Sequence, residues 1–236
     1  MKLRIRLAKQ HTARFFSHLD IQRTLERTLR RAALPLAYSQ GFNPHPRMSF
    51  ASALATGASS EGEFIDVDLS EPVAPAEFVE RANRCSPPGI TFVEAREVPA
   101  KGDSLFSLVD TAEYRLTFSA ASAAAVAEAV AAFLEREVVE VAKEGKRGTR
   151  LVNIREQVYE LTVAGSLPEP DGARVVVNLR AVLQSGAQGS LKPETLAEGL
   201  AQVSPAFGDT VLVGTHRLMI YRREPETGML KLPWEL

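Results

Sequence analysis

The order in which strand-like and helix-like patterns follow one another in the first hundred residues is the feature that most constrains the fold. Residues 2–8 alternate charged and aliphatic side chains, as a strand with one buried face does. Ser17 to Asp20 has the S-x-x-D spacing of a capping box, and it predicts a helix that runs to about Ala33 and ends before Pro35. Strands are then predicted at 48–54 and 63–69, a helix at 75–84 and a strand at 90–98. This order, β-α-β-β-α-β, is that of the ferredoxin-like fold.

A similar order recurs in the second half of the chain. Strands are predicted at 112–118, 174–182 and 211–221, and helices at 120–135 and 192–202, while the strand-like stretch 137–163 is interrupted by a basic loop at 143–150. We therefore predict an α+β protein of two tandem ferredoxin-like units with antiparallel sheets. The first, basic unit would cover 1–98, a linker 99–110, and the second unit, with its long basic hairpin, 111–236. One continuous α+β domain is the alternative.

Composition excludes several classes of protein. An apolar fraction of 45% in 236 residues supports a sizeable core and argues against disorder. No apolar run approaches the ~20 residues that span a bilayer, and the first residues do not resemble a signal peptide. We expect a cytoplasmic protein without a membrane partner. The single cysteine, Cys85, excludes an intrachain disulfide and any cysteine-built zinc or iron–sulfur centre, so no metal site or cofactor is expected in this chain. The oligomeric state stays open.

The charge is distributed unevenly along the chain. Residues 1–50 contain ten Lys and Arg residues against two acids, whereas the rest of the chain contains 18 basic and 27 acidic residues. Four of the basic residues lie on the first predicted helix at helical spacing: Arg23, Arg27, Arg30 and Arg31. Arginine presents a fork of donors that matches phosphate or carboxylate. This helix therefore predicts an anion-binding face, the alternative being a solvated face paired with Glu26.

The loop after this helix has an unusual composition, Tyr-Ser-Gln-Gly-Phe-Asn-Pro-His-Pro-Arg over residues 38–47. Its two prolines stiffen the backbone on both sides of the histidine, and its two aromatic rings can stack on a base or another flat ligand. We expect ligand contacts from Tyr38, Gln40, Phe42, Asn43, His45 and Arg47. The alternative is a compact loop that packs on its own rings.

Weaker candidates lie elsewhere in the chain. Glu61, in a small-residue stretch at 58–63, is a ligand-contact candidate, and the basic loop adds Lys146, Arg147 and Arg150 as phosphate contacts. His18 and His45 are the candidates for general acid or base catalysis. The sequence contains no Gly-rich phosphate loop, paired-histidine metal motif or nucleophile elbow.

Three stretches together resemble a known family. They are residues 16–20 (FSHLD), 30–35 (RRAALP) and 38–46 (YSQGFNPHP), and residues 59–64 (SSEGEF) fit the same pattern. They resemble the radical SAM-linked proteins, a domain of unknown function also called DUF2344. The resemblance is strong over about the first 70 residues, and it departs at Asn153, where the family pattern has Asp. It implies a radical SAM protein as the partner, and that partner would carry the iron–sulfur cluster and SAM.

Three functions remain open at this point. The first is an accessory, substrate-binding protein that holds RNA, tRNA or rRNA, through the basic helix and the 38–47 loop. The second is a protein-interaction subunit that docks on a radical SAM enzyme without nucleic acid. The third is a metal-independent endoribonuclease of the tandem ferredoxin-like type. The chain is not expected to be catalytic by itself.

Overall fold

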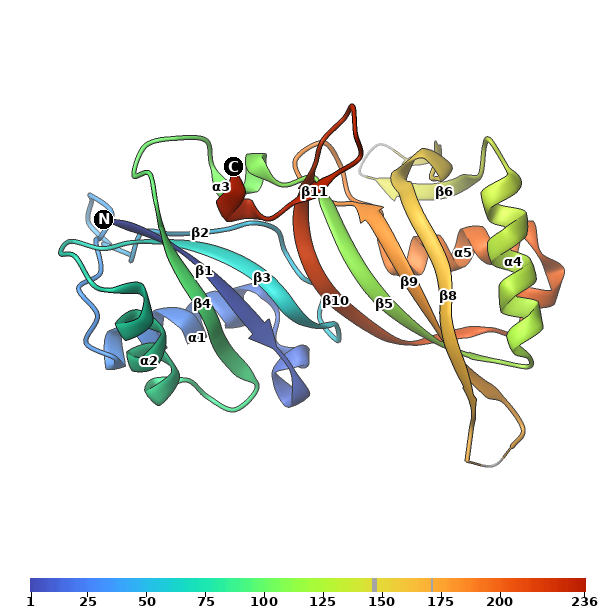
Figure 1. Ribbon diagram of the computed structural model, residues 1–236, viewed down its shortest axis with the longest axis horizontal. Coiled ribbons are helices and arrows are strands. Elements are labelled where there is room, and N and C mark those ends of the chain that lie inside the picture. Colours follow the sequence, from blue (N-terminus) through green and yellow to red (C-terminus); the bar gives the residue numbers. More distant parts are fainter. Residues whose placement is uncertain (146–147, 171) are drawn as a thin grey trace. The chain divides into compact units, whose positions relative to one another are not determined.

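A computed structural model describes residues 1–145, 148–170 and 172–236, which form a mixed α+β protein (Figure 1). Its residues divide into two compact units, Met1–Thr111 with Arg217–Leu236, and Ala112–His216. The predicted second unit extended to residue 236. The strand predicted at 211–221 is instead divided: its residues up to His216 belong to the second unit, and those from Arg217 onward belong to the first.

The first unit follows the predicted order of elements. These are β1 (Lys2–Lys9), α1 (His18–Arg31), β2 (Met48–Phe50), β3 (Ser59–Asp68), α2 (Pro75–Cys85) and β4 (Ile90–Val98). The strand order is β4-β1-β3, and both β2 and β10 (Val211–Arg223) pair with β3. The β1–β3, β1–β4 and β2–β3 pairs are antiparallel, and Ile5 at the centre of β1 lies opposite Ile65 and Ala95.

Both helices of the first unit cover the same face of its sheet. Leu25 and Leu29 of α1 and Phe78 of α2 pack on inward residues of the strands, such as Ile5 and Val67. Every second side chain of a strand points to one face, so the alternation in β1 accounts for this core. Two sequence predictions differ in extent. β2 ends at Phe50, short of the predicted 54, and β3 begins at Ser59, before the predicted start at 63.

Gly62 explains the second difference. It lies inside β3, where a Cβ atom would collide with the backbone of Leu218 and Met219 in β10. Glycine at this position therefore allows a close approach of two backbones instead of making a turn.

The other face of this sheet is covered by the segment 99–110 and the C-terminus. The predicted linker contains the short helix α3 (Leu105–Leu108), and β11 (Leu230–Lys231) pairs with β10. The Trp234 ring meets the Phe64 ring edge-on at 4.8 Å. The Arg4 guanidinium, buried on the same face, contacts both carboxylate oxygens of Asp66 at 2.7 and 2.9 Å and also donates to the Pro233 carbonyl.

The second unit has its own sheet and core. Its elements are β5 (Thr111–Ala120), α4 (Ala123–Glu135), β6 (Glu140–Gly145), β7 (Gly148–Asn153), β8 (Val158–Pro168), β9 (Val175–Gln184) and α5 (Pro193–Val203). The strand order is β10-β5-β9-β8, and β6 and β7 form a separate hairpin. Phe133 of α4 and Leu196 of α5 pack in the core on strand residues such as Leu116 and Leu179. No described helix is long and apolar enough to cross a bilayer.

Candidate functional site

The N-terminus of α1 is held by the predicted capping box. The Ser17 hydroxyl accepts a hydrogen bond from the Asp20 N–H at 3.2 Å, and the Asp20 carboxylate accepts from the Ser17 N–H at 3.1 Å and from its hydroxyl at 2.6 Å. These bonds, the one from the hydroxyl first, lower the pKa of Asp20. The capping box is therefore confirmed, and it sets the position at which α1 starts.

The helix presents its arginines to solvent. Leu25, Thr28 and Leu29 are buried, whereas the four predicted arginines are exposed on the outer side of α1. We call Arg23, Arg27, Arg30 and Arg31 the α1 arginine face. Arg31 donates to the Cys85 carbonyl at 2.9 Å, and none of the four forms an ion pair with a described carboxylate. The predicted pairing with Glu26 is absent from the described residues, where Glu26 accepts from Gln22 instead.

Part of this face borders an open groove. The groove has a volume of about 420 Å³, and its described lining consists of Phe16, Thr24, Arg27, Arg30, Arg31 and Pro87. Three arginine side chains thus share one concave surface with an aromatic side chain. Guanidinium groups that can approach one ligand together suit a ligand with several negative charges.

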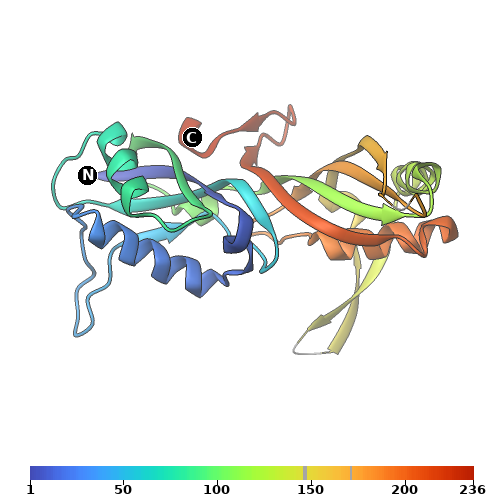
Figure 2. The same cartoon turned by 90° about the horizontal axis from the view of Figure 1, so that it is seen from below.

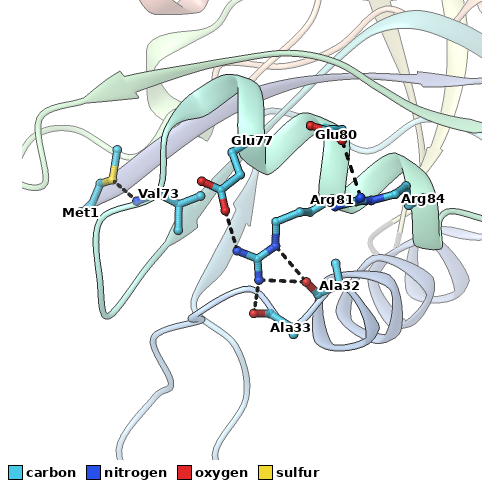
Figure 3. A network of polar contacts seen from close by, with 8 residues as sticks. All are labelled: Met1, Ala32, Ala33, Val73, Glu77, Glu80, Arg81 and Arg84. Carbon is cyan, nitrogen blue, oxygen red and sulfur yellow. Dashed lines mark hydrogen bonds and ion pairs between the residues drawn. The ribbon is translucent and has the colours of Figure 1, made fainter.

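The arginines of the neighbouring helix α2 are engaged differently (Figure 3). Arg81 donates to the Ala32 carbonyl at 3.0 and 3.1 Å and to the Ala33 carbonyl, and it pairs with Glu77 at 3.0 Å. Ala33 has a positive φ of 51°, so these bonds hold a strained turn that ends α1. Arg84 pairs with Glu80 at 3.6 Å. Both α2 arginines therefore have a carboxylate partner, in contrast to the α1 arginine face.

The 38–47 loop is an ordered hairpin that projects beyond the C-terminal end of α1 (Figure 2). The Ser39 N–H donates to the His45 carbonyl at 2.9 Å, and the His45 N–H donates to the Ser39 hydroxyl at 3.1 Å. Phe42 at its tip is fully exposed, and Gly41 has a φ of 131°. The alternative of a loop packed on its own rings is therefore wrong.

The loop meets the α1 arginine face at its base. The Arg30 guanidinium lies 5.7 Å from the centre of the Tyr38 ring, and Arg47 pairs with Asp68 at 3.0 Å. Gln40, Asn43 and His45 are exposed. The structure thus brings the predicted residues of the helix and loop to adjoining surfaces.

The other predicted residues are more scattered. Glu61 is exposed on β3, and Arg150 is exposed on β7 of the second unit, opposite Lys143. Lys146 and Arg147 lie outside the described residues. His18 opens α1 and His45 follows its C-terminal end, so the length of α1, about 20 Å, separates their elements. The two histidines are therefore not placed to act as an acid–base pair.

A small cavity at the start of α1 contains residues that the sequence did not single out. It has a volume of about 30 Å³ and is lined by Lys9, His18, Ser52, Glu63 and seven apolar side chains. Lys9 is buried, and its ammonium donates to the Phe16 carbonyl at 3.0 Å. Burial lowers the pKa of Lys9, the Glu63 carboxylate opposes that shift, and Arg217 adds to it.

Arg217 lies beside the cavity and forms hydrogen bonds to two of its lining residues, Ser52 and Glu63. Its guanidinium contacts both oxygens of Glu63 at 3.0 and 3.1 Å, and donates to the Ser52 hydroxyl at 2.9 Å and the Ala53 carbonyl at 3.1 Å. Alternation in β1 puts Lys9 on the same face as Leu3, Ile5 and Leu7, and this signal was available in the sequence. No sequence signal pairs Glu63 with an arginine 154 positions away. Among the described residues, no group of three or more His, Cys, Asp or Glu side chains could hold a metal ion.

Comparison with known protein families identifies the family of this chain. A model described as an uncharacterized protein conserved in bacteria, DUF2344, matches residues 2–193. The chain belongs to this family. The predicted family is therefore confirmed, whereas the association with a radical SAM protein stays a prediction.

Solved structures and curated proteins add little. The chain is similar to an unknown protein from Galdieria sulphuraria, whose crystal structure shares 17% sequence identity over 89% of this chain and 96% of that chain. The TM-score is 0.25, a value at which the likeness supports no argument about fold or function. None of the curated proteins matches the chain.

Proposed function

We propose that this protein is an accessory protein that binds RNA through the α1 arginine face and the 38–47 loop. The observation that carries the proposal is the α1 arginine face itself, four exposed arginines of which none forms an ion pair with a described carboxylate. Asp20, an acid on the same helix, has a pKa lowered first by its hydrogen bonds to Ser17 and in part by the charges of Arg23 and Arg27. Three of the four arginines line one groove. Arginines outside ion pairs that can approach a single ligand suit a chain of phosphates.

The loop supports RNA with unpaired bases over a duplex. Phe42 is fully exposed, and an exposed ring can stack on a base only where that base is not already paired and stacked in a helix. Arg30 over the Tyr38 ring joins the loop to the arginine face. A ligand can therefore place phosphates on the helix and a base on the loop.

We also propose that the two units are tandem ferredoxin-like folds. The support is their common order of elements. The first unit has β4-β1-β3-β2 with α1 and α2, and the second has β10-β5-β9-β8 with α4 and α5. The second unit would differ by the insertion of the β6–β7 hairpin between α4 and β8.

The proposed partner is a radical SAM protein. Its support is the resemblance of residues 16–20 and 38–46 to radical SAM-linked proteins. In this proposal the partner carries the iron–sulfur cluster and SAM, and the present chain presents the RNA to it. The protein-docking alternative predicts co-purification that survives nuclease but is lost when the α1 arginines are replaced.

A mobility-shift assay with total cellular RNA tests the RNA-binding proposal. Wild type is compared with the triple variant Arg27→Gln, Arg30→Gln, Arg31→Gln. We expect a shift by wild type that the triple variant loses at the same protein concentration. Equal weak binding by both proteins would contradict the proposal. Cleavage of RNA in EDTA that disappears when His18 and His45 are both replaced by Ala would favour the endoribonuclease instead.

A further inference from the structure

The cavity at the start of α1 contains a buried cation with unused hydrogen-bonding capacity. The Lys9 side chain reaches the cavity wall, and the residue is only 4% exposed. An ammonium group has three donors, and Lys9 uses one of them, toward the Phe16 carbonyl. No described residue accepts from the other two. Buried donors without a partner are costly, so an acceptor in this cavity would stabilise the folded protein.

The charges around the cavity favour an anionic acceptor. Glu63 is the only carboxylate in the described lining, and both of its oxygens contact the Arg217 guanidinium. Lys9 therefore adds a positive charge that no ion pair among the described residues neutralises.

The size and walls of the cavity limit what the anion can be. A volume of about 30 Å³ is room for about two water molecules, which suits a planar group of three heavy atoms. The remaining lining is apolar and includes Ile21, Phe50 and Leu54. His18 is exposed, its ring meets the Phe50 ring edge-on at 4.9 Å, and it makes no hydrogen bond to a described residue. The His18 ring therefore stands where a ligand would enter.

We propose that this cavity binds the carboxylate group of a small organic acid. The carboxylate fills the cavity and accepts hydrogen bonds from the Lys9 ammonium, and the rest of the acid extends outward past the His18 ring. His18 lies at the entrance. This site is separate from the α1 arginine face, and the proposal does not depend on RNA binding.

Titration calorimetry with the full chain tests the proposal. The probes are sodium acetate, butyrate and benzoate, with butyramide as the uncharged counterpart of butyrate. We expect saturable binding of at least one acid, and binding of butyramide weaker than that of butyrate by about tenfold or more, because a hydrogen bond to a charged group is lost. Absence of saturable binding by all three acids, or equal binding of butyrate and butyramide, would overturn it.

Two variants test separately whether binding needs the positive charge of Lys9 and whether it needs the empty volume of the cavity. Lys9→Met removes the ammonium and is expected to weaken acid binding by about tenfold or more. Leu54→Trp keeps the ammonium and fills the cavity, so it should abolish binding even if Lys9→Met fails to fold. Lys101→Met, an exposed lysine outside the cavity lining, is the matched control and should bind as wild type does. Unchanged binding by folded Lys9→Met, or by Leu54→Trp, would contradict the proposed site.

Discussion

Replacing three residues of the α1 arginine face tests the electrostatic basis of RNA binding quantitatively. The four arginines cover eight helical steps, about 12 Å along the axis, which matches three to four nucleotides of one strand at about 3.4 Å each. Each phosphate neutralised by an arginine on a single strand contributes about −0.7 to the slope of log K against log salt concentration. The triple variant Arg27→Gln, Arg30→Gln, Arg31→Gln should therefore reduce the magnitude of this slope by about 2.

The same relation gives the expected loss of affinity. At about 0.1 M salt each released counterion contributes about 1 kcal/mol, so loss of three contacts costs about 3 kcal/mol and weakens binding about a hundredfold. Fluorescence anisotropy of a labelled single-stranded RNA, measured between about 50 and 200 mM potassium chloride, provides both numbers. The replaced side chains are exposed, and their contacts lie at the surface: Arg27 donates to the Arg23 carbonyl, Arg31 donates to the Cys85 carbonyl, and Arg30 lies over the Tyr38 ring. We therefore expect little change in thermal stability.

A charge-matched variant makes the result specific. Lys101→Gln, Arg115→Gln, Arg136→Gln removes three exposed cations that do not lie on α1. Its salt-dependence slope and its affinity for RNA should equal those of wild type, apart from a small effect of the lower net charge. If both triple variants lower the slope and the affinity equally, the α1 arginine face is not the binding surface.

Three further predictions follow from single side chains. Phe42→Ala should weaken binding of single-stranded RNA by about 1–3 kcal/mol, the usual contribution of one stacked base, without changing the melting temperature; unchanged affinity would remove the loop from the proposed interface. Arg4→Met leaves the Asp66 carboxylate buried without its partner and should lower the free energy of unfolding by about 3–5 kcal/mol; a loss under about 1 kcal/mol in urea unfolding would show that the pair is solvated. Burial lowers the pKa of Lys9 in the folded protein below 10.5, the value expected in the unfolded chain. At pH values between these two pKa values, the unfolded chain therefore binds more protons than the folded protein does. Stability of wild type relative to Lys9→Met should therefore rise with pH across that window, and a flat difference would contradict a buried ammonium.

Local pattern alone predicted much of the first unit. The alternation in β1, the spacing of Ser17 and Asp20, and the proline that begins α2 are each read over a few residues, and the structure confirms the elements they predict. The strand was predicted to begin just after Gly62, because glycine permits both turns and close backbone contact. Only the neighbouring strand shows which of the two applies.

The candidate sites also combine features that local sequence predicts with features that depend on the tertiary structure. Helical spacing is enough to place the arginines of α1 on one side of the helix, because 3.6 residues per turn is a property of the backbone. Their lack of carboxylate partners, and the exposure of Phe42, depend on which residues other segments bring close.

The amino-acid sequence was thus sufficient to predict the order of the longer helices and strands, the family, and the arginine-rich side of α1. Three features became visible only in the folded chain: Glu63 pairs with Arg217, a cavity lies beside Lys9, and β10 is divided between the two units. The physical reason is the separation along the sequence of the residues that interact. Capping and periodicity act between residues a few positions apart, whereas burial and ion pairing depend on contacts between residues far apart in the sequence, which only folding brings together.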